Sequence, residues 1–237
     1  KRKISYDYTG GRGMLTDVVT PSEKVKHLVD DKLYILEQIG FRVDEKLRNP
    51  FLRKEIFFEE NRKRFVQNVN ALGKTIIGIH PGASLYIKQW EQYDILAEEI
   101  HRVSQNCFFV IFCGPGEDDI ANKVANYLKE RKIEYLLSKT SMDEYIKTIS
   151  YCDIVICNDS GAGHLASALG VEVFVLMGPF DPEFGAPMGE KVHTFSKKIS
   201  CKPCLSRTCS NDKQCLKLIS VHEVVSQVVE VLKTKER

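Results

Sequence analysis

The sequence lacks any apolar run that approaches the roughly 20 residues a helix needs to cross a bilayer. Its first residues, KRKISYDYTGG, also lack the apolar core of a secretory signal peptide. We therefore expect neither a membrane-spanning helix nor secretion, and we expect the protein to act in the cytoplasm.

Signatures of nucleic-acid binding are missing as well. No stretch interleaves basic with aromatic side chains, no strand has an RNA-recognition composition, and no zinc-finger spacing with paired histidines occurs. The net charge is only +2. We therefore expect no nucleic-acid partner.

Two common nucleotide-binding motifs are incomplete. The segment TGGRGMLTD, residues 9–17, has two glycines of a dinucleotide fingerprint but lacks the third. No lysine of the Walker type follows a glycine-rich loop. Both absences disfavour NAD binding and ATP hydrolysis.

The charge that is present is distributed unevenly. Residues 1–74 hold 16 Lys and Arg against 11 Asp and Glu, whereas the remainder holds 18 against 21. A basic front suits contact with a phosphate-rich ligand or an anionic membrane surface, and it equally suits a solvated basic face.

From residue 75 onward, short apolar runs alternate with amphipathic segments. In a chain of 237 residues with 43% apolar content, this alternation predicts an α/β fold with a Rossmann-like, doubly wound parallel sheet. Ligands of such sheets bind beyond the carboxyl ends of the strands, so the loops that follow the strands are expected to converge on one crevice. Strands are predicted at 75–79, 107–113, 134–137, 154–157 and 173–177, and helices at 90–104, 118–131, 142–150 and 161–169.

The first 74 residues follow a different pattern. One strand is predicted at residues 3–8, and helical segments at 23–39 and 57–72, with Leu28 and Leu36 among the residues expected to face inward. One strand and two helices are too few for a convincing domain. We therefore divide the chain into a partial N-terminal domain, residues 1–74, and a Rossmann-like domain, residues 75–237.

The stretch IVICNDSGAGHLASALG, residues 154–170, predicts a phosphate-binding turn. A buried strand passes into a polar, glycine-rich turn that opens a helix. Gly161 and Gly163 allow backbone N–H groups at the positive end of the helix dipole to face one anion. Asp159, Ser160 and His164 add polar side chains, although His164 also suits a histidine whose hydrogen bonds the fold satisfies.

Two other loops carry candidate ligands. The loop HPGASLYIKQW contains Lys88, whose ammonium would neutralise a diphosphate leaving group. The alternative is a solvated lysine at a helix start. The loop CGPGEDD contains Glu117, whose carboxylate suits a ribose diol but would also favour a helix N-terminus.

The eight cysteines fall into two groups. Four lie in or beside apolar strand runs, where free thiols act as small buried apolar groups. Cys201, Cys204, Cys209 and Cys215 instead cluster in a polar loop, where only the first pair has the spacing of a metal knuckle. This second group is a candidate zinc site, with free thiols or disulfides as the alternatives.

Taken in order, HPGAS, KQW, GPGE, KTSMDEYIKTISYCDIVICNDSGAGHLASALG, GPFDP and CKPC resemble glycosyltransferase family 9, the heptosyltransferases of lipopolysaccharide core assembly. The resemblance covers about residues 75 to 230. It implies a GT-B fold of two facing Rossmann-like domains, with residues 75–237 as the C-terminal, nucleotide-sugar-binding domain. It also implies inverting sugar transfer that requires no metal or other cofactor.

The resemblance assigns roles to residues of the predicted crevice. Asp159 is expected to contact the donor sugar, and Glu117 with the loop at Thr140 the nucleoside. Lys88 and Asp159 are the candidate catalytic residues. The residues expected to hold the diphosphate are Ser84, Lys88, Ser160, Gly161, Gly163 and His164.

The front of the chain is similar to the second half of the family's acceptor domain, on the segments KISYDYTGGRGMLTD and LYILEQIGF. The resemblance implies that the first half, with an aspartate proposed as the general base, lies outside this chain. Nothing at residues 1–10 replaces that aspartate. Inverting transfer needs a base opposite the departing diphosphate, so donor binding is the more direct expectation.

The expected function is transfer of a sugar, with heptose as the preferred candidate, from an ADP-linked or other nucleotide-sugar donor. The expected acceptor is a lipopolysaccharide core or a related glycolipid or oligosaccharide, with peripheral contact to the inner membrane. Two alternatives stay open: a nucleotide-sugar epimerase of similar architecture, and a nucleotide-sugar-binding module without catalysis.

Overall fold

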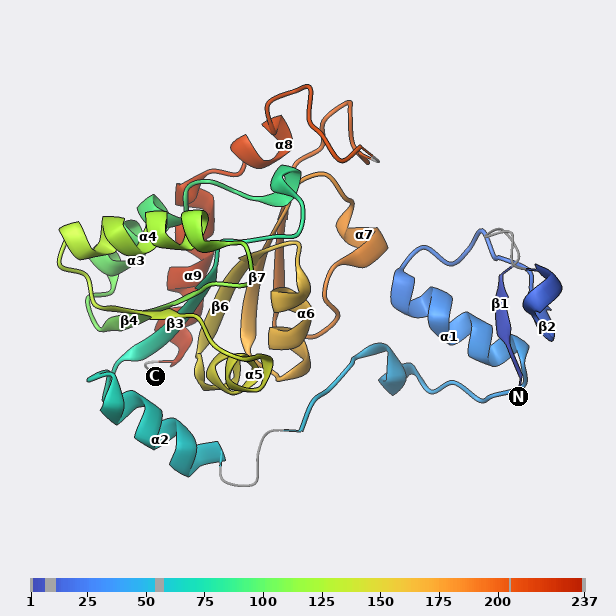
Figure 1. Ribbon diagram of the computed structural model, residues 1–237, viewed down its shortest axis with the longest axis horizontal. Coiled ribbons are helices and arrows are strands. Elements are labelled where there is room, and N and C mark those ends of the chain that lie inside the picture. The colour runs from blue at the N-terminus through green and yellow to red at the C-terminus, as the bar shows by residue number, and fades with distance from the viewer. Residues whose placement is uncertain (1, 7–11, 54–57, 205, 236–237) are drawn as a thin grey trace. The chain divides into compact units, whose positions relative to one another are not determined.

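The computed structural model describes residues 2–6, 12–53, 58–204 and 206–235 (Figure 1). The chain divides into two compact units. One comprises residues 1–50 with 183–185, and the other comprises residues 51–182 with 186–237.

The larger unit is built on a six-stranded sheet in the order β5-β4-β3-β6-β7-β8. All neighbouring strands in it run parallel. From β3 the chain adds strands toward one edge of the sheet up to β5, then returns to the middle and adds β6 to β8 toward the other edge. This order confirms the α/β class and the doubly wound topology. The strands are β3 (Thr75–His80), β4 (Cys107–Phe112), β5 (Tyr135–Ser138), β6 (Ile154–Asn158), β7 (Glu172–Met177) and β8 (Val192–Ser196).

Helices cover both faces of this sheet, as Figure 1 shows. Side chains alternate between two apolar clusters: Ile77 faces the helices α3, α4 and α9, whereas Ile76 faces α2, α5 and α6. Burial on both faces explains why these strands read as continuous apolar runs. The helices are α2 (Phe58–Asn68), α3 (Tyr93–Val103), α4 (Asp118–Glu130), α5 (Met142–Tyr151), α6 (Gly161–Ala168) and α9 (Val221–Lys235).

Local signals set the ends of these helices. The Ser141 side chain caps α5 by accepting from the Glu144 amide at 3.5 Å. Gly170 follows α6 with φ +70°, a left-handed conformation that glycine adopts without steric cost. The helix predicted from residue 90 begins only at Tyr93, and the Trp90 amide before it donates to the Asn158 side chain.

Several short elements after residue 75 were not predicted from the sequence. Among them are β8 and two single-turn helices, α8 (Gln214–Lys217) and α7 (Pro182–Gly185), most of which belongs to the smaller unit. β8 is an edge strand in which only Phe195 is buried, so it carries no continuous apolar run. Four-residue helices are too short to show a helical period.

The smaller unit contains a parallel pair of strands, β1 (Ile4–Tyr6) and β2 (Asp17–Val19), and the helix α1 (Leu28–Gln38). Its single-turn helices are η1 (Arg12–Met14) and η2 (Glu45–Arg48). The prediction that Leu28 and Leu36 face inward was wrong, because both are exposed and no residue of α1 is buried. Two three-residue strands offer too little surface to cover a helix face.

Part of the predicted N-terminal pattern falls outside the described residues. This holds for residues 7 and 8 of the expected strand and for the first three residues of the TGGRGMLTD segment. None of the helices in the described residues is long and apolar enough to cross a membrane.

The centre of the sheet provides a test of packing. A Cβ at Gly78 in β3 would lie 2.8 Å from the Phe112 ring and 3.0 Å from the Cys152 sulfur. We expect Gly78→Ala to lower the free energy of unfolding by about 1–3 kcal/mol, the usual cost of overfilling a packed core. Urea unfolding measures this. Gly161→Ala is the matched control, since a Cβ there meets nothing within 4 Å, and an equal loss in both variants would contradict the packing account.

Candidate functional site

The candidate site lies where the strand order reverses, between β3 and β6. These strands pair in parallel, with His80 opposite Cys157, so their loops leave the same edge of the sheet side by side. The β3 loop leads to the single-turn helix η3 (Tyr86–Lys88), and the β6 loop leads to α6. Ligands of doubly wound sheets bind at this kind of switch point.

Lys88 and Asp159, the two candidate catalytic residues, meet at this point. The Lys88 Nζ lies 2.8 Å from Asp159 Oδ2, and only 16% and 11% of the two side chains are exposed. The ammonium also lies 4.6 Å from the centre of the Phe180 ring. A carboxylate and an aromatic face therefore hold the cation in place, and an incoming anionic ligand would compete with Asp159 for it.

The turn after β6 places polar groups at the start of α6. Ser160 occupies the N-cap position, but its hydroxyl makes no capping hydrogen bond. This buried Oγ finds no hydrogen-bond partner among the described residues. Gly161 and His164 in the first turn are exposed. The first turn thus combines helix-dipole amides with side-chain donors, an arrangement that suits an anion.

Gly163 lies on the buried side of α6. A Cβ there would come within 3.1–3.2 Å of Pro187, Cys157 and Val175. Because Gly163 has no side chain, α6 packs close to the sheet. This packing fixes the position of the turn between β6 and α6. Gly163 therefore acts in the site through helix packing.

Glu117, in the loop after β4, is held by a hydrogen-bond chain. Its Oε2 accepts from the Gly114 amide at 2.9 Å and lies 3.1 Å from His80 Nε2. The Tyr145 hydroxyl lies 2.8 Å from His80 Nδ1. Burial raises the pKa of Tyr145, so its O–H stays protonated and donates to Nδ1, which leaves Nε2–H to donate to Glu117.

This series of hydrogen bonds controls the charge of Glu117. The hydrogen bond with His80 lowers the pKa of Glu117, opposed by burial and supported by the electrostatic interaction with His80 and by the Gly114 amide. Gly82 is needed beside it, because a Cβ there would overlap the carboxylate. Glu117 is thus an ionised acceptor in a fixed position.

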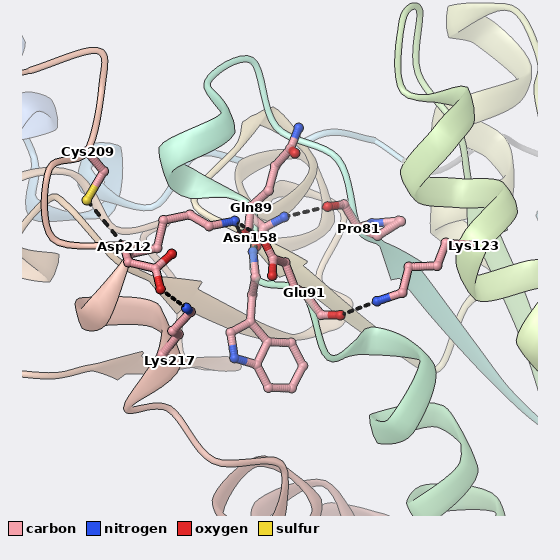
Figure 2. A network of polar contacts seen from close by, with 10 residues as sticks. Pro81, Gln89, Glu91, Lys123, Asn158, Cys209, Asp212 and Lys217 are labelled. Carbon is pink, nitrogen blue, oxygen red and sulfur yellow. Dashed lines mark hydrogen bonds and ion pairs between the residues drawn. The ribbon is translucent and has the colours of Figure 1, made fainter.

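Asn158 at the end of β6 is a structural centre of the site that sequence reasoning did not assign a role. It is fully buried. Its Nδ2 donates to the Pro81 carbonyl at 2.8 Å (Figure 2). Its Oδ1 accepts from the Trp90 amide at 2.9 Å, and its Nδ2 also donates to the Gly82 carbonyl at 3.1 Å. A polar side chain ending an otherwise apolar strand was the available signal.

Lys202, in the loop after β8, interacts electrostatically with Asp181 and Asp159, and sequence reasoning assigned it no role. Burial lowers the pKa of Lys202, opposed by the negative charge of Asp181 and, more weakly, by Cys215 and Asp159. Its Nζ donates to the Ser196 hydroxyl at the end of β8. It comes from an irregular loop, where no periodic pattern reveals which side chains turn toward the sheet.

The remaining predicted residues lie in loops at the carboxyl edge of the sheet. Ser84 follows β3 and Thr140 follows β5, and both are exposed. The structure thus places Lys88 and Asp159 in contact, whereas Glu117 is engaged by a separate chain through His80.

The four clustered cysteines gather around one small cavity, which Ile87 and Pro179 also line. All four are free thiols in the structure. Within the described ranges, no group of three or more His, Cys, Asp or Glu side chains is placed to hold a metal ion. The described residues therefore contain no assembled ligand set for the predicted zinc site.

Sequence comparison decides the family. Residues 1–215 match the model for glycosyltransferase family 9 (heptosyltransferase). The chain belongs to glycosyltransferase family 9. It is 30% identical to lipooligosaccharide heptosyltransferase 2 of Campylobacter jejuni over 167 residues, which are 68% of this chain and 52% of that protein. This family 9 chain thus spans about half the length of that relative.

Solved structures show the same fold. The structure of Escherichia coli ADP-heptose lipopolysaccharide heptosyltransferase II has a TM-score of 0.80 at 20% identity, covering 100% of this chain and 71% of its own. That of E. coli heptosyltransferase WaaC with ADP-2-deoxy-2-fluoro heptose has a TM-score of 0.61 at 14% identity, covering 97% and 65%. The family 9 chain therefore shares the fold of the GT-B heptosyltransferases.

The lowered pKa of Glu117 predicts a pH dependence. A carboxyl whose pKa is lower when folded stabilises the protein above its unfolded value, about 4.3, and this contribution is lost as the pH falls below it. We expect the stability difference between the wild type and Glu117→Gln to be larger at about pH 5 than at about pH 3.5.

Urea unfolding at both pH values measures this difference. Glu130→Gln, at the exposed end of the same helix, is the control. A Glu117→Gln difference that stays constant across this range would contradict the proposed hydrogen-bond chain.

Proposed function

We propose that this chain binds a nucleotide diphosphate sugar, with ADP-heptose as the donor. In the whole protein, we propose that the heptose passes with inversion to a lipopolysaccharide core or a related glycan. The Lys88–Asp159 pair beside the open first turn of α6 carries this proposal. It places an ammonium and the N-terminal amides of a helix at the same edge of the sheet.

Each group has a chemical task in this proposal. Lys88 leaves Asp159 to neutralise the charge that develops on the departing diphosphate. The amides at the start of α6 and the Ser160 hydroxyl bind phosphate oxygens. Asp159, released from Lys88, accepts a hydrogen bond from a donor-sugar hydroxyl, and ionised Glu117 accepts one from the ribose.

The proposed transfer uses no metal cofactor. The ammonium of Lys88, the nearby ammonium of Lys202 and the α6 dipole would together supply positive charge to a diphosphate. The general base that takes the proton of the acceptor hydroxyl is proposed to come from the acceptor domain, on the face opposite the leaving group. A glycolipid acceptor would place the reaction at the cytoplasmic face of the inner membrane.

The family supports the choice of donor. Its description names heptosyltransferases, and the solved E. coli WaaC structure contains an ADP-linked fluoro-heptose. The switch-point geometry independently supports the same class of ligand, since a cation and a helix N-terminus together suit a diphosphate.

Removing the Lys88 charge tests donor binding. We expect Lys88→Met to weaken ADP-heptose binding by about 10-fold or more, because a hydrogen bond to a charged group contributes about 1.5–3 kcal/mol. Isothermal titration calorimetry measures this. The matched control is Lys129→Met on the exposed side of α4. Unchanged affinity in Lys88→Met would remove Lys88 from the donor site.

The reaction class requires a separate assay on the whole protein with ADP-heptose and a core acceptor. We expect ADP release only when the acceptor is present, inversion at the transferred anomeric carbon, and no loss of rate with EDTA. Conversion of the donor without acceptor would indicate an epimerase. Binding without release of ADP under any condition would indicate a non-catalytic module.

A further inference from the structure

Lys213 is a buried lysine that the proposed chemistry does not use. Only 3% of the residue is exposed. Lys213 is the N-cap residue of α8, and in the sequence it lies between Cys209 and Cys215 of the cysteine cluster. A lysine ammonium is rarely buried unless charged or polar partners compensate for lost hydration, so its contacts carry information.

Among the described residues, the Lys213 ammonium contacts residues 85–91, which we call the Lys88 loop. Its Nζ donates to the Gln89 carbonyl at 3.1 Å and to the Glu91 carboxylate. It also lies 4.6 Å from the centre of the Tyr86 ring. Lys88 itself lies between the contacted residues. One buried cation thus joins three groups that flank the proposed donor lysine.

The backbone around Lys213 is shaped to present this side chain. Asp212 and Lys213 have φ values of 43° and 52°, a left-handed conformation that is unfavourable for residues with a Cβ. The Lys213 amide donates to the Cys209 sulfur at 3.2 Å. The turn is therefore held by a cysteine of the cluster, which gives Cys209 a structural task.

The Lys88 loop is also fixed by Asn158. Figure 2 shows Gln89 and Asn158 in the middle of the view, with Glu91 beside them and Cys209 and Asp212 on the segment at the left. Asn158 holds the Trp90 amide, and Lys213 holds the groups on either side of it. The two anchors come from different parts of the chain, and each holds what the other does not.

We propose that Lys213 is a positioning residue: it braces the Lys88 loop so that the Lys88 ammonium meets the donor diphosphate. The part of this statement that concerns the donor rests on the proposed function. The bracing itself is a property of the free protein. Through Cys209, which holds the Lys213 amide, the cysteine loop thereby supports the donor-binding lysine.

Hydrogen–deuterium exchange of the free chain tests the bracing without any ligand. We expect Lys213→Met to speed amide exchange in peptides covering residues 85–91, and Lys213→Arg to keep exchange slower than Lys213→Met does. Lys217→Met is the matched control, because Lys217 lies in the same segment and pairs with Asp212. Unchanged exchange in Lys213→Met, or equal acceleration in Lys217→Met, would overturn the proposal.

A double-mutant cycle tests whether Lys213 acts through Lys88. Calorimetry with ADP as the probe should show about a 10-fold weaker affinity for Lys213→Met in the wild-type background. In the Lys88→Met background the further loss should fall below about 2-fold, because the residues act as a unit. An equal loss in both backgrounds would show a general structural effect and would contradict positioning.

A milder variant covers the case in which Lys213→Met does not fold. Glu91→Ala removes the anionic partner, whose side chain is 57% exposed, and leaves Lys213 in place. We expect a smaller acceleration of exchange in the same peptides, and no acceleration would count against the brace. If the wild-type chain binds no ADP, the proposed function fails, whereas the exchange experiment still decides the bracing.

Discussion

The site depends on the hydrogen bonds of the Asn158 side-chain amide. This amide joins β6 to the loop after β3 through three hydrogen bonds, at the edge of the sheet where the two halves of a doubly wound fold separate. Because the residue is fully buried, leaving any of these groups unpaired would be costly. These hydrogen bonds hold the Lys88 loop in position, and in this position the Lys88 ammonium lies next to Asp159.

The charged groups of the site form pairs, and a ligand can separate one of these pairs. Lys88 rests on Asp159 in the free chain, whereas Glu117 is held ionised by His80 and Gly114. The first pair exchanges its internal contact for one with a diphosphate in the proposed reaction, while the second keeps its geometry. Once the donor is bound, both groups would be in place before charge develops on the leaving group.

The sequence was sufficient for the parallel sheet, because strands buried on both faces, such as β4 and β6, are continuous apolar runs. It also located Lys88 and Asp159 correctly at the carboxyl edge, since strand ends alone define that edge. It did not reveal β8, whose single neighbour leaves it half polar, or the bracing by Lys213. Such contacts depend on the path of an irregular loop, which no periodicity encodes.

The central claim is that the edge between β3 and β6 holds the donor diphosphate. An experimental structure of the chain with ADP-heptose tests it most directly. The account predicts phosphate oxygens within hydrogen-bond distance of the Lys88 Nζ and the first amides of α6, with the Lys88–Asp159 ion pair opened. A nucleotide bound elsewhere, with that ion pair intact, would contradict the account.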